Sequence, residues 1–128
     1  MKKILIIDDE KNFCALLKIN LELRSDYDVI TATSAKEGIC AAEQNRPDLI
    51  LLDAALPDMD GLEALKILKK DEKTASIPVL MLTGGIDKEF REKAMGLYDG
   101  DYITKPVDIE VLKSKIEEVL KRFLKDPS

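Results

Sequence analysis

The chain has 128 residues, of which 45% are hydrophobic and 35% charged, and its formal net charge is -5. This composition suits one compact domain and excludes an intrinsically disordered chain. The acidic balance argues against direct nucleic-acid binding by this segment, because such binding needs clustered Lys and Arg. No stretch reaches the roughly 20 apolar residues that span a bilayer, and the start does not resemble a secretion signal. We therefore expect a cytoplasmic protein that contacts no membrane.

Five short apolar runs predict the strands of a sheet. The first, third and fourth are continuously apolar and rich in Ile, Leu and Val, which is typical of parallel strands covered on both faces. The five runs are Ile4–Ile7, Val29–Ala32, Leu49–Leu52, Val79–Leu82 and Tyr102–Ile103 with its neighbours.

Amphipathic segments alternate with these runs and predict five helices. Ser34 and Glu37 form a capping box before the second helix, and Asp108 suits the N-cap of the last. This alternation predicts a doubly wound α/β domain with right-handed crossovers. The residues expected on the inner faces are Phe13, Leu16, Leu17 and Leu21; Ile39 and Ala42; Leu62, Leu65 and Leu68; Phe90, Ala94 and Leu97; and Ile109, Leu112, Ile116, Val119 and Phe123.

The cysteine and histidine content limits the kinds of catalytic and metal site that the chain can form. Cys14 and Cys40 lack the spacing of metal ligands, and we expect both to be small buried hydrophobes. The chain contains no histidine. Histidine-based acid–base catalysis, histidine metal ligation and a phosphohistidine carrier are therefore excluded.

Polar residues follow four of the predicted strands. Asp8 and Asp9 follow the first run, Asp53 the third, Thr83 the fourth and Lys105 the fifth. Ligands of doubly wound sheets bind outside the carboxyl ends of the strands. If the first and third strands are neighbours, three carboxylates converge there, and they repel one another unless a cation lies among them. Mg²⁺ suits such a site because it binds few carboxylates and leaves positions for phosphate oxygens.

Lys105 and Thr83 extend this prediction to phosphoryl transfer. The lysine offers a positive charge to a phosphoryl oxygen, and the threonine hydroxyl offers a hydrogen bond. In phosphoryl transfer, catalysis is mostly positioning and charge neutralisation. A single aspartate at a strand end is most often a turn or cap residue. The joint placement at four strand ends therefore carries the prediction.

The motifs around these residues resemble the response-regulator receiver domain of two-component signalling, over essentially the whole chain. They are Ile6–Glu10, Leu51–Gly61, Val79–Gly84 and Asp101–Pro106. The resemblance implies one receiver domain over residues 1–128, with a five-stranded parallel sheet of the flavodoxin-like type in the strand order 2-1-3-4-5.

The resemblance also implies metal and phosphoacceptor residues. Asp53 would be the nucleophile that becomes an aspartyl phosphate. Asp9 and Asp53 would ligate Mg²⁺, or Mn²⁺, directly, and Asp8 would act mainly through a metal-bound water. The backbone carbonyl of Ala55 would supply a further ligand.

Further residues would bind the phosphoryl group and respond to it. Lys105 would bind the group, Thr83 would move to meet it, and Tyr102 would be an aromatic switch that follows Thr83. Structural roles fall to Pro57 and Gly61 in the loop beyond Asp53, and to Pro106, whose bond to Lys105 would be cis.

Such a module would receive its phosphate from a sensor histidine kinase or a histidine phosphotransfer protein. It would lose the phosphate slowly and would not be a turnover enzyme on an external substrate. Phosphorylation would switch the face of the fourth helix, fifth strand and fifth helix, where Lys88, Arg91 and Met95 are candidate exposed positions. The output would be either a downstream protein or a domain that follows Ser128.

Three features depart from the family pattern. Gly84 and Gly85 follow Thr83 where the family usually has alanine first, which predicts a mobile loop. The run Tyr98-Asp99-Gly100-Asp101 shifts a glycine that the family has earlier, which puts the turn geometry in doubt. Ala55 can neither hydrogen-bond an attacking water nor block it, so the sequence sets no phosphoryl lifetime.

Three other functions are alternatives to a receiver. A pseudo-receiver would only bind proteins, and it is disfavoured by the complete set of acidic, lysine and threonine residues. A haloacid-dehalogenase-like phosphatase or mutase would show an Asp-x-Asp pair, and Asp53-Ala54-Ala55 lacks the second acid. A flavin or nucleotide binder is disfavoured because no glycine-rich loop follows the first strand.

Overall fold

The computed structural model describes residues 1–23, 26–84 and 101–124. Five parallel strands form a sheet in the order β2-β1-β3-β4-β5, which confirms the predicted fold class and strand order. The strands are β1 (Lys2–Ile7), β2 (Tyr27–Ala32), β3 (Leu49–Asp53), β4 (Val79–Thr83) and β5 (Asp101–Thr104).

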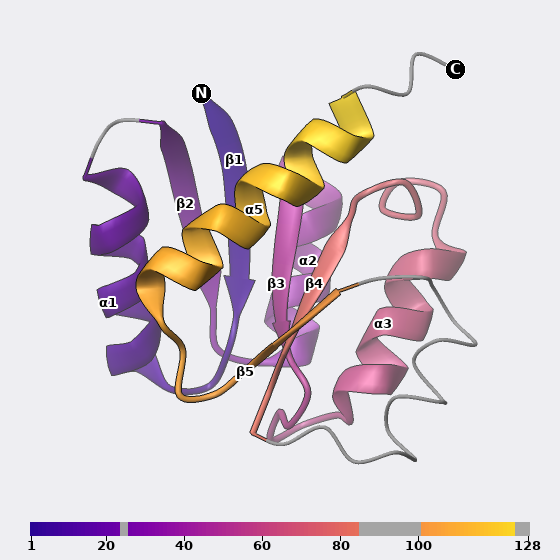
Figure 1. Cartoon of the computed structure of the whole chain (residues 1–128). Helices are drawn as coiled ribbons and strands as arrows, with labels where there is room; N and C mark the ends of the chain where they lie inside the picture. Colours follow the sequence, from indigo (N-terminus) through magenta and orange to yellow (C-terminus); the bar gives the residue numbers. More distant parts are fainter. Residues whose placement is uncertain (24–25, 85–100, 125–128) are drawn as a thin grey trace.

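Helices cover both faces of the sheet (Figure 1). Helices α1 (Lys11–Glu22) and α5 (Ile109–Leu124) pack on one face, and α2 (Ala35–Asn45) and α3 (Gly61–Lys70) pack on the other. Successive side chains of a strand point to opposite faces. In β1, Ile4 and Ile6 therefore enter the first hydrophobic cluster and Leu5 and Ile7 enter the second. This two-sided burial explains the continuously apolar run.

Capping side chains define where two helices begin. The Ser34 hydroxyl accepts a hydrogen bond of 3.1 Å from the Glu37 N–H at the start of α2. Asp108 Oδ1 accepts the N–H groups of Glu110 and Val111, at 2.9 and 3.3 Å, at the start of α5. Both residues satisfy donors that lack a partner inside the helix. Ser34 and Asp108 are thus confirmed as helix caps.

Leu16 and Phe123 were wrongly predicted to be inward, since they are 53% and 50% exposed. In α1 the buried stripe is Cys14, Leu17 and Leu21, and Leu16 is rotated away from Leu17 by about 100°. Among the residues of α5 whose burial the structure describes, Leu120 is the last buried one, and Phe123 lies about one turn farther along the helix.

The two cysteines have different environments. Cys14 is buried as predicted, and burial is the main reason why its thiol pKa rises to about 11. Cys40 was wrongly predicted to be buried, because it lies on the exposed side of α2. The buried positions of that helix are Ala35, Gly38 and Ala42.

Some predictions concern residues outside the described ranges. They are the fourth helix with Phe90, Ala94 and Leu97, the loop at Gly85, the run Tyr98–Gly100, and the candidate exposed positions Lys88, Arg91 and Met95. Within the described ranges, the helices are too short or too polar to cross a membrane. The cytoplasmic location stays a prediction.

The neighbours Leu16 and Leu17 provide a matched test of the α1 packing. Leu17→Ala should lower the free energy of unfolding by about 2–5 kcal/mol, because a fully buried side chain leaves a cavity. Leu16→Ala should change it by about 0.5 kcal/mol or less, because the side chain already faces solvent. Urea unfolding of both variants measures the difference. Equal losses would show that α1 is rotated about its axis relative to this structure.

Candidate functional site

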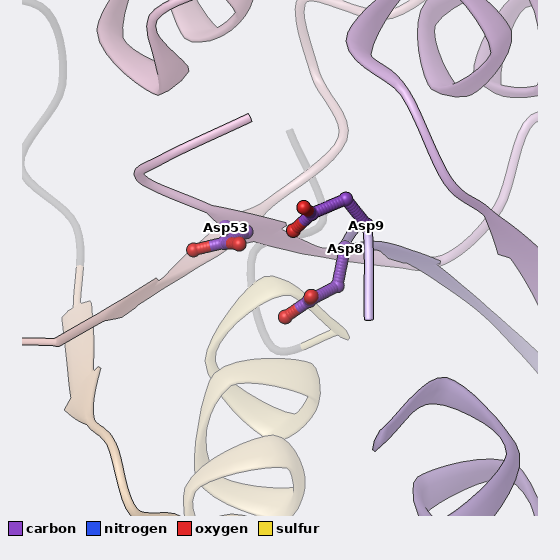
Figure 2. A group of neighbouring side chains, drawn as sticks. All are labelled: Asp8, Asp9 and Asp53. Atoms are coloured by element: carbon purple, nitrogen blue, oxygen red, sulfur yellow. The ribbon is translucent and has the colours of Figure 1, made fainter. Parts of the chain in front are cut away.

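Three carboxylates meet at the carboxyl edge of the sheet. Asp8 and Asp9 follow β1 directly, and Asp53 is the last residue of β3. Strands β1 and β3 are neighbours, with Ile7 opposite Leu52, so the residues that follow this pair come together. One carboxylate oxygen from each aspartate lies within 4.8 Å of the other two. In Figure 2, the side chains of Asp8 and Asp9 extend from β1 toward the side on which Asp53 lies.

Backbone hydrogen bonds hold the two buried aspartates. Asp8 is fully buried; its N–H donates to Ala32 at 3.0 Å, and its Oδ1 accepts the Glu10 N–H at 2.9 Å. Asp53 is 5% exposed, and its Oδ1 accepts the Ala55 N–H at 3.2 Å. Asp9 is exposed, so the cluster is open to solvent on one side.

Among the described residues, Lys105 brings a positive charge to this site. Its Nζ lies 2.7 Å from Asp8 Oδ2, 3.6 Å from Asp53 Oδ2 and 3.7 Å from Glu10 Oε1. The Phe13 ring lies below it, with its centroid 4.8 Å from Nζ, which is within the range of a cation–π contact. The contacts of Glu10 and Phe13 with this lysine were not predicted from the sequence. Their position directly after Asp9 and in the first turn of α1 was the available signal.

Burial and neighbouring charges shift the pKa values of Asp53 and Lys105. Burial raises the pKa of Asp53; the Ala55 N–H and Lys105 lower it, while Asp8 and Asp9 raise it further, and the net direction is upward. Burial would lower the pKa of Lys105, but its hydrogen bond to Asp8 and the charges of Asp53, Asp8 and Glu10 outweigh this and raise it. The Lys105 ammonium thus lies near three carboxylates, those of Asp8, Glu10 and Asp53. Their hard oxygen donors suit a small divalent cation such as Mg²⁺.

Comparison with known proteins agrees with this geometry. The sequence profile of the response regulator receiver domain matches residues 4–117. The chain belongs to this family. Receiver domains are the signalling modules of response regulators in two-component systems, so the resemblance inferred from the four motifs is confirmed.

Two curated relatives and one solved structure illustrate the range of the family. The receiver is 45% identical over 123 residues to the alkaline phosphatase synthesis transcriptional regulatory protein PhoP of Bacillus subtilis, covering 94% of this chain and 49% of that protein. It is 38% identical to protein PilH of Pseudomonas aeruginosa, covering 94% and 98%. A CheY-like receiver domain protein from Methanospirillum hungatei superposes with a TM-score of 0.91 at 34% identity, covering 98% of each chain. The chain spans about half the length of the curated relatives PhoP and RpaA, the second of which is a transcriptional regulator from Synechocystis.

Two further receiver residues lie on the strands beyond β3. Thr83 ends β4 and is buried, one residue beyond the Leu82 that pairs with Asp53, so it lies at the carboxylate edge. The N–H of Lys105 donates to the Thr83 carbonyl at 2.7 Å, which joins the ends of β4 and β5. Tyr102 in β5 is partly buried and packs against the cluster under α2 and α3. The peptide bond between Lys105 and Pro106 is cis, as predicted.

The loop after Asp53 closes tightly on itself. The N–H of Gly61 donates to the Ala54 carbonyl at 3.0 Å. A Cβ added to Gly61 would lie 2.6 Å from Ala54 Cα and 2.7 Å from the carbonyl oxygens of Asp53 and Ala54. Backbone atoms cannot move aside as a flexible side chain can. Gly61 is therefore needed at this point, whereas Pro57 and Ala55 are exposed.

Two glycines of this region give a matched pair of variants. Gly61→Ala should destabilise the fold by about 1–3 kcal/mol through overpacking, although alanine itself favours a helix by up to about 1 kcal/mol. Gly84→Ala should be within about 0.5 kcal/mol of the native protein, because a Cβ there meets nothing within 4 Å. Thermal unfolding measures both. A Gly61→Ala variant as stable as native would contradict the tight closure of the loop.

Proposed function

We propose that this receiver accepts a phosphoryl group on Asp53 from a histidine kinase or a histidine phosphotransfer protein. The observation that carries the proposal is the placement of the Asp53 carboxylate, buried at a strand end, beside two other carboxylates and 3.6 Å from the Lys105 ammonium. An Asp53 oxygen attacks the phosphorus and forms the new O–P bond. The N–P bond to the donor histidine breaks, and the released imidazole nitrogen takes up a proton.

The fitting cofactor is Mg²⁺, with Mn²⁺ as a substitute. Asp9, Asp53 and the backbone carbonyl of Ala55 would hold it directly, and Asp8 would hold it mainly through a water. When bound, the cation neutralises the carboxylates and stabilises the charge of the phosphoryl oxygens. The donor set supports this proposal. One carboxylate oxygen from each of the three aspartates lies within 4.8 Å of the other two, and Mg²⁺ prefers negatively charged oxygen ligands.

This chain's own residues would position and balance the transferred group. The Ala55 N–H on Asp53 Oδ1 orients the carboxylate, and Lys105 is close enough to bind a phosphoryl oxygen. The Thr83 hydroxyl would donate to another oxygen of that group. Formation of these contacts only after phosphorylation would bias Thr83 and Tyr102 toward a second arrangement. The switched face at the fourth helix stays a prediction.

We further propose a signalling module rather than an enzyme that turns over an external substrate. The aspartyl phosphate would be lost slowly by hydrolysis. The relatives PhoP and RpaA are named as transcriptional regulators, and PilH matches over almost its whole length. The family therefore includes transcriptional regulators about twice as long as the matched segment and a protein of about its length, and we propose that the output of this receiver is either a further domain or a separate protein. Direct nucleic-acid binding by this segment is not proposed, because its net charge is -5.

Asp53 is tested by mass spectrometry of the intact protein with Mg²⁺ and acetyl phosphate. The native receiver should gain about 80 Da, the mass of a phosphoryl group, whose charge the site is built to balance. Asp53→Ala should gain nothing, and Asp28→Ala, at an exposed position of β2, should label like the native protein. Persistent labelling of Asp53→Ala would assign the phosphoacceptor elsewhere. A native protein that is never labelled would favour the pseudo-receiver.

Lys105→Ala should separate metal binding from phosphoryl transfer. Mg²⁺ should bind more tightly, because an ammonium 2.7 Å from Asp8 Oδ2 no longer opposes the cation. Labelling by acetyl phosphate should slow by at least about tenfold, because the transferred group loses a charged partner. A Mg²⁺ titration and a labelling time course measure the two effects. Lys66→Ala, at an exposed position of α3, is the control. Unchanged labelling would remove Lys105 from the mechanism.

A further inference from the structure

A single side chain joins the loop after Asp53 to a helix from another part of the chain. Asp58 lies in the loop between β3 and α3. Its Oδ1 accepts the Ala35 N–H at 2.9 Å, and its Oδ2 accepts the Lys36 N–H at 3.0 Å. Both donors belong to the first turn of α2. The carboxylate therefore spans the gap between the loop and that helix with both of its oxygens.

The first turn of α2 is suited to hold a carboxylate. The first N–H groups of a helix have no partner within the helix, and this end carries a partial positive charge. Ser34 already satisfies the Glu37 N–H, and Asp58 satisfies the two before it. The N–H groups of Ala35 and Lys36 lower the pKa of Asp58, so the contact is a charge-assisted one at neutral pH.

Among the described residues, the backbone hydrogen bonds of this loop lie at its base, while Leu56 and Met59 pack against the hydrophobic cluster under α2 and α3. The Ala54 N–H donates to Leu82 in β4 at 2.8 Å, and the Gly61 N–H donates to the Ala54 carbonyl at 3.0 Å. Ala55 pairs with Asp60 in an isolated bridge across the loop. Asp58 fastens the far part of the loop to a separate element. Ala55 lies between the two attachments, and its N–H contacts the Asp53 carboxylate.

We propose that Asp58 is a positioning residue of the receiver site, which holds the backbone of Ala55 in place by fastening its loop to α2. This inference rests on the proposed function, in which Ala55 contributes a carbonyl ligand and orients Asp53. It has a reciprocal consequence. If the Asp58 contact favours cation binding, cation binding must favour the Asp58 contact and protect the first turn of α2 by the same factor.

The first experiment measures Mg²⁺ affinity by NMR titration of three variants. Asp58→Ala should weaken binding by about three- to tenfold, less than the usual loss for a direct partner of a metal ligand, because the loop base remains tied. Asp58→Asn keeps one acceptor oxygen and should fall between Asp58→Ala and the native protein. Ser34→Ala is the matched control, because it removes a cap from the same helix and leaves the loop untouched. Its affinity should stay within about twofold of native.

The second experiment measures amide hydrogen exchange at Ala35 and Lys36. Saturating Mg²⁺ should slow exchange at both amides in the native protein and in Ser34→Ala, and should leave it unchanged in Asp58→Ala. An unfolding curve of each variant establishes whether that variant is folded. If Asp58→Ala does not fold, the same two measurements on Asp58→Asn test the proposal.

The outcomes separate this inference from the proposed function. Native-like Mg²⁺ affinity and Mg²⁺-dependent protection in Asp58→Ala, with the native protein labelled at Asp53, would overturn the positioning role alone. An equal loss of affinity in Ser34→Ala and Asp58→Ala would overturn it too, because the cause would then be the helix end and not the loop. A native protein that neither binds Mg²⁺ nor is labelled would overturn both proposals.

Discussion

Mutual repulsion of three aspartates is the constraint on which the rest of this receiver depends. Asp8, Asp9 and Asp53 stay within 4.8 Å of one another because the sheet holds them there. Strands β1 and β3 pair in register, and their apolar side chains are fully buried on both faces, so neither strand can slide to relieve the repulsion. Like charges held together by a rigid core favour the binding of positive charge, which a divalent cation and the Lys105 ammonium can supply.

The Lys105 ammonium supplies part of this positive charge. Lys105 thereby links the carboxylates to the ends of β4 and β5. Its ammonium contacts Asp8 and Asp53, while its backbone N–H bonds to Thr83 at the end of β4. The cation–π contact with Phe13 ties the same side chain to α1. A change of charge at Asp53 must therefore alter the forces on Lys105, which directly follows β5 and contacts Phe13 of α1. No long-range mechanism is needed for this coupling, because each step is a direct contact.

The sequence was sufficient for the strands, their alternation with helices and the position of the acidic residues at strand ends, because hydrophobic period and strand-end position are local signals. The meeting of the acidic residues also required the first and third strands to be neighbours. The order 2-1-3-4-5 came from the family resemblance. Helical periodicity wrongly predicted that Leu16 and Phe123 are buried. Periodicity locates the apolar stripe of a helix, but it gives neither the width of the stripe nor the point at which the sheet beneath the helix ends. The contacts of Phe13 with Lys105 and of Asp58 with α2 join residues far apart in the chain, which only the folded backbone brings together.

The same site reaches both layers of helices. Lys105 contacts Phe13 of α1, on the face that α1 and α5 cover. Asp58 connects the loop after Asp53 to α2 on the opposite face. These routes differ in kind. The lysine route responds to charge, because the ammonium is attracted to whatever negative group replaces a bare carboxylate at Asp53. The Asp58 route responds to position, because two hydrogen bonds of fixed geometry transmit a displacement of the loop but little of its charge. A phosphoryl group on Asp53 changes charge and occupies space at once, so it would act on both layers simultaneously.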